Sequence, residues 1–128
     1  MTYILDTCTF IWLCSRPSAL SRAARKCIDD PVNELALSDV SAMEITMKWA
    51  AGQIALPHPP RIWIEKQMQT WELTSIALTR DDIYRSGELP EHHRDPFDRL
   101  LVGTALNRNA TLVTPDDAIH RYPVSTCW

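Results

Sequence analysis

The stretch DPFDRLLVGTALNRNATLVTPD (residues 95–116) predicts a helix, then a short strand, then an acidic residue. The helix runs from about Pro96 to Arg108, with apolar side chains at helical spacing on one face. The run from Thr111 to Thr114 is short and of β type, as expected for a buried strand. A buried strand that leads to a carboxylate, here Asp116, needs an explanation, because ligands of open α/β sheets bind outside the carboxyl ends of the strands.

The first residues of the chain show the same pattern. Tyr3–Leu5 is an apolar run too short for anything but a buried strand, and Asp6 and Thr7 follow it directly. We expect one domain over residues 1–128, of the three-layer α/β/α class, with a central, mostly parallel sheet of about four to five strands. Strands are expected at residues 3–5, 34–38, 73–78, 111–114 and 124–127, and helices at residues 7–14, 18–27, 41–51 and 96–108 and after residues 60, 79 and 117.

Length and composition indicate an ordinary soluble globular protein. A chain of 128 residues is long enough for a core of its own and too short for two domains. The formal net charge is −3, with 13 basic against 16 acidic residues, so the total does not indicate a general polyanion binder. If a cation neutralised four of these acids, the remaining net charge would change from −3 to +1 and would not repel a phosphate backbone.

Cysteine usage and hydropathy indicate a cytoplasmic protein. Cys8, Cys14, Cys27 and Cys127 form no CxxC pair and have no zinc-like spacing, so we expect small buried hydrophobic residues in a reducing compartment. The N-terminal residues lack a basic region, and Asp6 interrupts their apolar stretch, which argues against a signal peptide. No run approaches the roughly 20 apolar residues that a membrane span needs.

Two further carboxylates, Glu44 and Asp98, lie on predicted helices and fall within the apolar stripe of each. An ionised carboxylate on a face directed at the core is costly unless a cation meets it. The stripe expected around Glu44 consists of Val40, Met43, Met47 and Ala51, and the one around Asp98 of Leu101, Val102 and Ala105.

Helix capping is the plainer explanation for most of these acids. Ser41–Glu44 has the spelling of a capping box, Asp95 and Asp98 occupy the N-cap and N3 positions of one helix, and Asp116 can cap the helix after it. Capping does not explain why two acids face apolar stripes and two others follow buried strands. Because like charges in a partly buried site repel each other, we favour a divalent cation held by Asp6, Glu44, Asp98 and Asp116.

A carboxylate site without histidine or thiolate suits Mg²⁺ or Mn²⁺, which prefer oxygen ligands. Such an ion acidifies a bound water enough to attack phosphorus near neutral pH and stabilises the charge that develops on the phosphate. Thr7 and Thr114, beside two of the acids, could orient the water or a carboxylate. As β-branched residues at strand ends they also have a purely structural explanation.

At this point four motifs resemble a known family: YILDT (residues 3–7), SAMEI (residues 41–45), HRDPFDRLL (residues 93–101) and LVTPD (residues 112–116). In this order and spacing they look like the successive motifs of PIN-domain ribonucleases, specifically the VapC-like toxins of bacterial toxin–antitoxin modules. The resemblance covers essentially the whole chain, and four motifs in sequence are far more specific than one.

The resemblance implies a Mg²⁺- or Mn²⁺-dependent endoribonuclease with Asp6, Glu44, Asp98 and Asp116 as its acidic quartet. It also implies an RNA substrate, a cognate antitoxin and a homodimer. Asp95 is a candidate fifth acid, although N-cap is its better role. Lys48, Arg94 and Arg99 flank the acids as candidate RNA phosphate contacts or as plain surface charge. For Trp12, Trp63, Trp71 and Trp128 we expect core packing for at least half, and to His92 and His93 we assign no role.

One rival stays open at this stage. A PIN-like binding or assembly module, without catalysis, could carry the same acids as helix caps. The identity of the RNA, the number of metal ions and the family of the antitoxin do not follow from the sequence.

Overall fold

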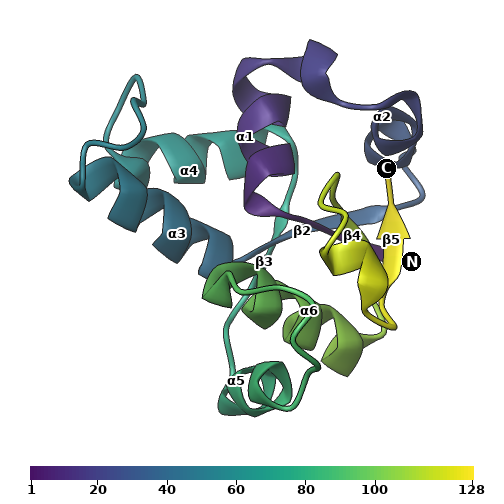
Figure 1. The fold of residues 1–128 in the computed structure, drawn as a ribbon. Coiled ribbons are helices and arrows are strands. Elements are labelled where there is room, and N and C mark those ends of the chain that lie inside the picture. The colour runs from purple at the N-terminus through teal and green to yellow at the C-terminus, as the bar shows by residue number, and fades with distance from the viewer.

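Five parallel strands form the central sheet of the computed structural model, which describes residues 1–128 (Figure 1). β1 lies in the middle, and the order across the sheet is β3-β2-β1-β4-β5. Because every neighbouring pair is parallel, the carboxyl ends of all five strands lie along one edge of the sheet. The predicted fold class is confirmed. The strands are β1 (Thr2–Leu5), β2 (Glu34–Ser38), β3 (Thr74–Ile76), β4 (Thr111–Val113) and β5 (Ser125–Cys127).

Helices cover both faces of this sheet and give it three layers (Figure 1). Adjacent residues of β1 point to opposite faces, so Leu5 belongs to one apolar cluster and Ile4 to the other. None of the helices has both the length and the apolar character of a membrane span. The α-helices are α1 (Thr7–Ser15), α2 (Arg22–Asp29), α3 (Asp39–Ala50), α4 (Pro60–Thr70), α5 (Arg80–Gly87) and α6 (Pro96–Arg108).

Local capping explains where the helices begin and corrects three predicted starts. The helix expected from Ser18 begins at Arg22, because Ser21 accepts the hydrogen bond of a first-turn amide and a short 3₁₀ turn precedes it. The helix expected from Ser41 begins at Asp39, with Ser38 as its N-cap. The helix expected near Asp117 is only a 3₁₀ turn at Ile119–Arg121.

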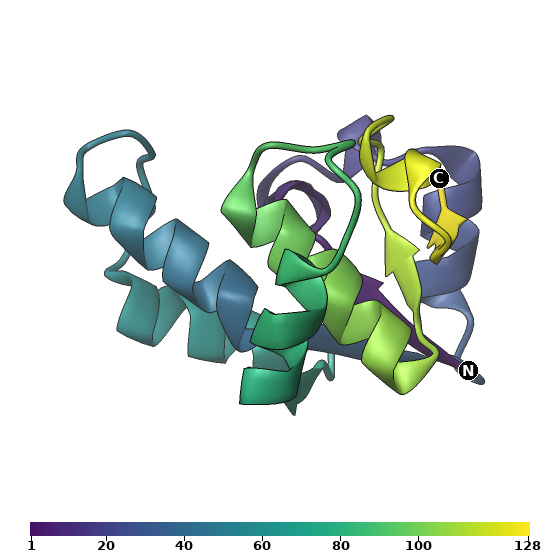
Figure 2. The ribbon, with the colours of Figure 1, turned by 60° about the horizontal axis from the view of Figure 1, so that its bottom comes forward.

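The apolar stripe predicted for α3 is correct at Val40, which is buried, and wrong at Met43, Met47 and Ala51, which are exposed. Met43 is 40% exposed and Met47 is 56% exposed. The physical reason is that α3 runs past the edge of the sheet beside α4 (Figure 2), so its contacts and not its hydropathy decide which face is buried. The prediction for α6 is confirmed, since Leu101, Val102 and Ala105 are all fully buried. The buried residues of α3 are Val40, Ser41, Glu44 and Ile45.

The predicted burial of the cysteines is also wrong, whereas the tryptophan prediction is confirmed. All four cysteines are half-buried, and Cys14 packs against the edge of an apolar cluster. Trp63 is buried, Trp71 and Trp128 pack against the same apolar cluster, and Trp12 lies against the ring of Trp128.

Helices α5 and α6 pack closely because a glycine lies between them. A Cβ atom on Gly103 would lie 2.8 Å from the carbonyl oxygen of Asp82 and 3.1 Å from the amide nitrogen of Ser86. The buried carboxylate of Asp82 adds an ion pair with Arg108 at 2.7 Å. The close packing of α5 on α6 positions the segment that connects the two helices.

We predict that Gly103→Ala lowers the free energy of unfolding by about 2 kcal/mol, because the added methyl group meets backbone atoms of α5. The matched control is Gly87→Ala at the end of α5, where a Cβ would meet nothing within 4 Å. That variant should be neutral or slightly stabilising, because alanine favours helix. Urea denaturation of both variants measures the difference. Equal stability of the two would contradict the close helix contact.

Candidate metal centre

The sheet brings two of the predicted acids to one edge. Asp6 directly follows β1, and Asp116 lies three residues after β4. β1 and β4 are parallel neighbours with Leu5 paired to Val113, so both strands end at the same level. Glu44 reaches this edge from α3 and Asp98 from the first turn of α6. A hollow of about 290 Å³ is lined by Asp6, Thr7, Cys8, Glu44, Lys48, Asp95, Asp98, Pro115 and Asp116.

Asp6 is the most enclosed of the four acids, with 3% of its surface exposed. It is the N-cap of α1, since its Oδ1 accepts the hydrogen bond of the Thr9 amide at 2.8 Å. Burial raises the pKa of Asp6, and hydrogen bonds from Thr114 and Thr9 oppose this rise. The Thr114 hydroxyl also accepts a hydrogen bond from the Asp116 amide at 3.1 Å. Thr114 therefore ties two of the acids together.

Glu44 is buried in the middle of α3 and is 5% exposed. The capping box predicted for Ser41–Glu44 is absent, because the helix begins earlier. Glu44 instead forms an ion pair with Lys48, one turn further along α3. The hydroxyl groups of Thr7 and Ser41 share a buried hydrogen bond of 3.0 Å, which joins α1 to α3 beside Glu44. Helix capping does not explain this acid.

Asp98 shows the charge conflict most directly. Burial, together with the negative charges of Asp95, Asp6 and Glu44, raises the pKa of Asp98 to about 7 against the opposing effect of His93. The N-cap of α6 is Asp95, as predicted, because its Oδ1 accepts the Phe97 amide at 2.9 Å. Asp98 accepts no backbone hydrogen bond, so capping does not account for its position either.

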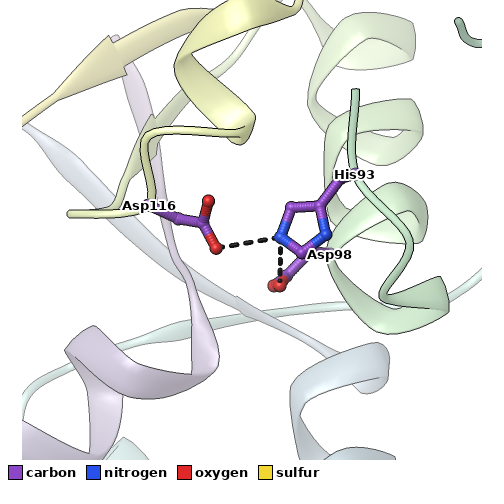
Figure 3. A group of neighbouring side chains, drawn as sticks. All are labelled: His93, Asp98 and Asp116. Atoms are coloured by element: carbon purple, nitrogen blue, oxygen red, sulfur yellow. Dashed lines mark hydrogen bonds and ion pairs between the residues drawn. The ribbon is translucent and has the colours of Figure 1, made fainter. Parts of the chain in front are cut away.

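His93, for which no sequence pattern indicates a role, lies between two of the acids (Figure 3). Its Nε2 is 2.9 Å from a carboxylate oxygen of Asp116 and 3.0 Å from one of Asp98. Its Nδ1 accepts the Asp95 amide at 3.1 Å, which leaves Nε2 as the donor to the acids. His93, Asp98 and Asp116 offer ligand atoms that all lie within 4.8 Å of one another. Two adjacent histidines in a loop carry no sequence pattern from which this contact could be predicted.

The loop that carries His93 is anchored from two sides. The Tyr122 hydroxyl accepts hydrogen bonds from the His92 and His93 amides and donates one to the Pro90 carbonyl at 2.9 Å. The guanidinium of Arg99 donates to the same hydroxyl at 3.2 Å. Arg99 also donates to the carbonyl oxygens of Ser86, Leu89, Pro90 and His93.

These bonds distinguish the three cations that were predicted to contact RNA. Arg99 is engaged inside the protein, and Lys48 is paired with Glu44. Arg94 is exposed and lines a second hollow of about 450 Å³ with Glu91, His93 and Arg99.

Comparison with known proteins identifies the family. Residues 3–124 match the family model of the PIN domain. The chain belongs to the PIN domain family. It is 31% identical over 127 residues to ribonuclease VapC22 of Mycobacterium tuberculosis, an alignment that covers 95% of this chain and 94% of the relative. The VapC-like resemblance is therefore confirmed.

Solved structures show that this PIN domain shares the fold of proteins in toxin–antitoxin complexes. The DNA-bound VapBC of Salmonella typhimurium aligns with a TM-score of 0.73 and 17% identity, over 98% of this chain and 96% of that chain. VapBC2 of Rickettsia felis, bound to a DNA fragment from its promoter, aligns with a TM-score of 0.71 and 17% identity, over 98% and 97%. VapBC-5 of Mycobacterium tuberculosis aligns with a TM-score of 0.61 and 15% identity, over 98% and 94%.

The donor set of this PIN domain fits a hard divalent cation. Carboxylate oxygens predominate in the hollow, and they are the ligands that Mg²⁺ and Mn²⁺ prefer. The raised pKa of Asp98 indicates that ionisation of all the acids is energetically costly without a positive charge among them.

We predict that Asp98→Asn stabilises the metal-free protein at pH 8 by on the order of 2 kcal/mol. The pKa of Asp98 is raised from 3.8 in the unfolded chain to about 7 in the folded protein. Below pH 3.8 the carboxyl group is protonated in both states and stability is at its full value. As the pH rises through 7, ionisation favours the unfolded chain and this stability is lost, and Asp98→Asn avoids the loss. The gain should disappear near pH 4. Urea denaturation in a chelator measures both values.

The matched control is Asp82→Asn, because Arg108 and Asn107 overcome burial and hold the pKa of Asp82 at about 2. Asp82 stabilises the fold above its unfolded pKa, and the contribution is lost as the pH falls through about 2. This variant should therefore be destabilised at pH 8. A loss of stability in Asp98→Asn at pH 8 would instead indicate a capping role.

We also predict that Tyr122→Phe lowers the free energy of unfolding by about 2 kcal/mol, because it removes the shared partner of two loop amides and of Arg99. The control is Tyr84→Phe, since Tyr84 is 61% exposed on α5. In an NMR titration the imidazole signals of His93 should move in the first variant only. Unchanged signals would show that the loop does not depend on Tyr122.

Proposed function

We propose that this PIN domain is a divalent-metal-dependent endoribonuclease that acts as the toxin of a toxin–antitoxin pair. One observation carries the proposal: acids from four separate segments line a single hollow at the carboxyl edge of the sheet. The ribonuclease VapC22, which aligns over almost the whole chain, supports the activity. The VapBC complexes of the same fold support the biological setting.

Asp6, Glu44, Asp98 and Asp116 would together hold Mg²⁺ or Mn²⁺. When bound, such an ion acidifies water and stabilises negative charge on a phosphate during hydrolysis of an RNA phosphodiester. Asp6 and Glu44 form the floor of the hollow, because they are 3% and 5% exposed. The side chains of Asp98 and Asp116 are 17% and 32% exposed and lie at its open side, where a phosphate could approach.

The other residues of the site orient these acids and balance their charge. Thr114 contacts both Asp6 and Asp116, and the ion pair with Lys48 offsets the charge of Glu44. Burial raises the pKa of Asp116, but the hydrogen bond from His93 and the amides of Ala118 and Ile119 outweigh it and lower the pKa, so this acid is ionised at neutral pH. Of the predicted phosphate contacts, Arg94 is the most accessible to RNA.

The rival without catalysis accounts for only part of the site. Asp6, Asp95 and Asp116 do accept amide hydrogen bonds at the start of helices or turns. Glu44 and Asp98 do not, yet they lie in the same hollow. A metal site gives all of these acids one explanation.

We further propose that the protein binds a cognate antitoxin and forms a homodimer. Large apolar side chains are exposed on the neighbouring helices α3 and α4, and surfaces of this kind are commonly covered by protein partners. The exposed fractions are 40% for Met43, 56% for Met47, 39% for Trp49 and 55% for Ile62.

The decisive experiment is RNA cleavage by the purified protein with Mg²⁺ or Mn²⁺ and with a chelator. Asp6→Asn, Glu44→Gln and Asp98→Asn should each lower the cleavage rate roughly 100-fold or more without unfolding the protein. Isothermal titration with Mn²⁺ should show weaker binding in the same variants. The matched control is Asp39→Asn, an exposed acid on the same helix as Glu44, which should keep both activity and metal binding.

Cleavage that persists in a chelator would exclude metal dependence. Cleavage at an unchanged rate in Asp6→Asn or Asp98→Asn would exclude the acidic site as the catalytic centre.

A further inference from the structure

Two thiols outside the acidic hollow lie unusually close together. The Sγ atoms of Cys27 in α2 and Cys127 in β5 are 2.9 Å apart, although 100 positions separate these residues in the chain. A disulfide bond measures about 2.05 Å, so the two sulfur atoms need to approach by less than about 1 Å to form one.

The secondary structure aims both side chains at each other. Cys127 pairs with Val113 of β4, whose side chain belongs to the apolar cluster on the α2 side of the sheet. Side chains of paired residues in a parallel sheet point to the same face, so Cys127 is directed at α2. There its Sγ lies 3.6 Å from the carbonyl oxygen of Ala23, one helical turn before Cys27.

The backbone of each cysteine is held in place. The carbonyl oxygen of Cys127 accepts the Thr114 amide at 3.1 Å, and that of Cys27 accepts the side-chain amide of Asn33 at 2.9 Å. The thiols therefore face each other across a fixed helix–strand contact. Both are half-buried, so a small reagent can reach them.

We propose that Cys27 and Cys127 form an oxidative modification site, at which a small disulfide such as oxidised glutathione produces an intramolecular bond between α2 and β5. The proposal is independent of the nuclease activity.

The reaction balances as a thiol–disulfide exchange. The Cys27 thiolate attacks one sulfur of oxidised glutathione, the glutathione S–S bond breaks, and one glutathione thiolate leaves. This step leaves Cys27 in a mixed disulfide with the other glutathione. The Cys127 thiol then gives its proton to the released glutathione thiolate and attacks the Cys27 sulfur, the mixed disulfide bond breaks, and the second glutathione leaves as a thiolate that takes up a proton from water. Two protein thiols are oxidised and one small disulfide is reduced to two thiols.

The order of attack follows from the surroundings of Cys127. Burial and the neighbouring Cys27 raise the pKa of Cys127 to about 12, so this thiol is protonated at neutral pH and is a poor first nucleophile. Its short distance to Cys27 suits it for the second, intramolecular step.

The other two cysteines serve as internal controls. Cys8 and Cys14 lie on the same helix, six positions apart, which separates them by about 9 Å along the helix axis. Burial raises the pKa of Cys14 to about 12, and burial together with the charges of the nearby acids raises that of Cys8 to about 12. Neither contacts another cysteine.

The bond would fasten an edge strand. β5 pairs only with β4, and the Cys127 carbonyl accepts the amide of Thr114, the residue that contacts Asp6 and Asp116. A link across 100 positions restricts the unfolded chain, so we expect the melting temperature to rise by roughly 10 °C.

The test is a peptide map of the folded protein after incubation with oxidised glutathione. Trypsin cleaves after Lys26, Lys48 and Arg121, which places Cys27 in peptide 27–48 and Cys127 in peptide 122–128, apart from Cys8 and Cys14. We expect these two peptides to be joined, with the loss of two hydrogen atoms and of two of the four free thiols. In urea the same treatment should give a mixture of links.

Variants sharpen the result. Cys14→Ala should keep the link and the rise in melting temperature, and Cys27→Ala should lose both. The proposal is overturned if the folded wild-type protein yields no joined peptide, links the cysteines in the same mixture as in urea, or forms only links between molecules. Since the wild-type map decides these outcomes, a variant that fails to fold does not affect the conclusion.

Discussion

The parallel pairing of β1 with β4 is the constraint on which the site depends. With Leu5 opposite Val113, the two central strands end together, and the residues after them are brought to one edge of the sheet. Asp6 and Asp116 are 110 positions apart in the chain and meet for this reason alone. Helix α3, which follows β2, and helix α6, which leads into β4, also begin at this edge and add Glu44 and Asp98.

Gathering acids in this way has an energetic cost that the surrounding residues reduce. The pKa of Asp98 is raised to about 7, which shows that charge repulsion and burial work against ionisation. Lys48 pairs with Glu44, Thr114 donates to Asp6, and His93 lies against Asp98 and Asp116. These partners reduce the electrostatic repulsion among the acids in the metal-free protein. The carboxylate oxygens stay available to a cation.

The position of His93 depends on structure far from the hollow. Gly103 allows α5 to approach α6, and the segment after α5 is fastened by Tyr122 and Arg99 before it reaches the acids. Arg99, which looks like a surface cation in the sequence, donates its hydrogen bonds to this loop. The packing of α5 against α6 therefore helps to determine where the connecting segment places His93.

The fold class, the five strands, the N-cap role of Asp95 and the buried stripe of α6 can all be predicted from the amino-acid sequence, because strand length, capping chemistry and apolar periodicity are local properties. The sequence also pointed to the four acids. Four features become visible only in the folded chain: Met43 and Met47 are exposed, Glu44 is not a helix cap, His93 contacts Asp98 and Asp116, and Cys27 lies against Cys127. Each of these depends on which distant segments pack together, and periodicity along one element carries no information about its neighbours.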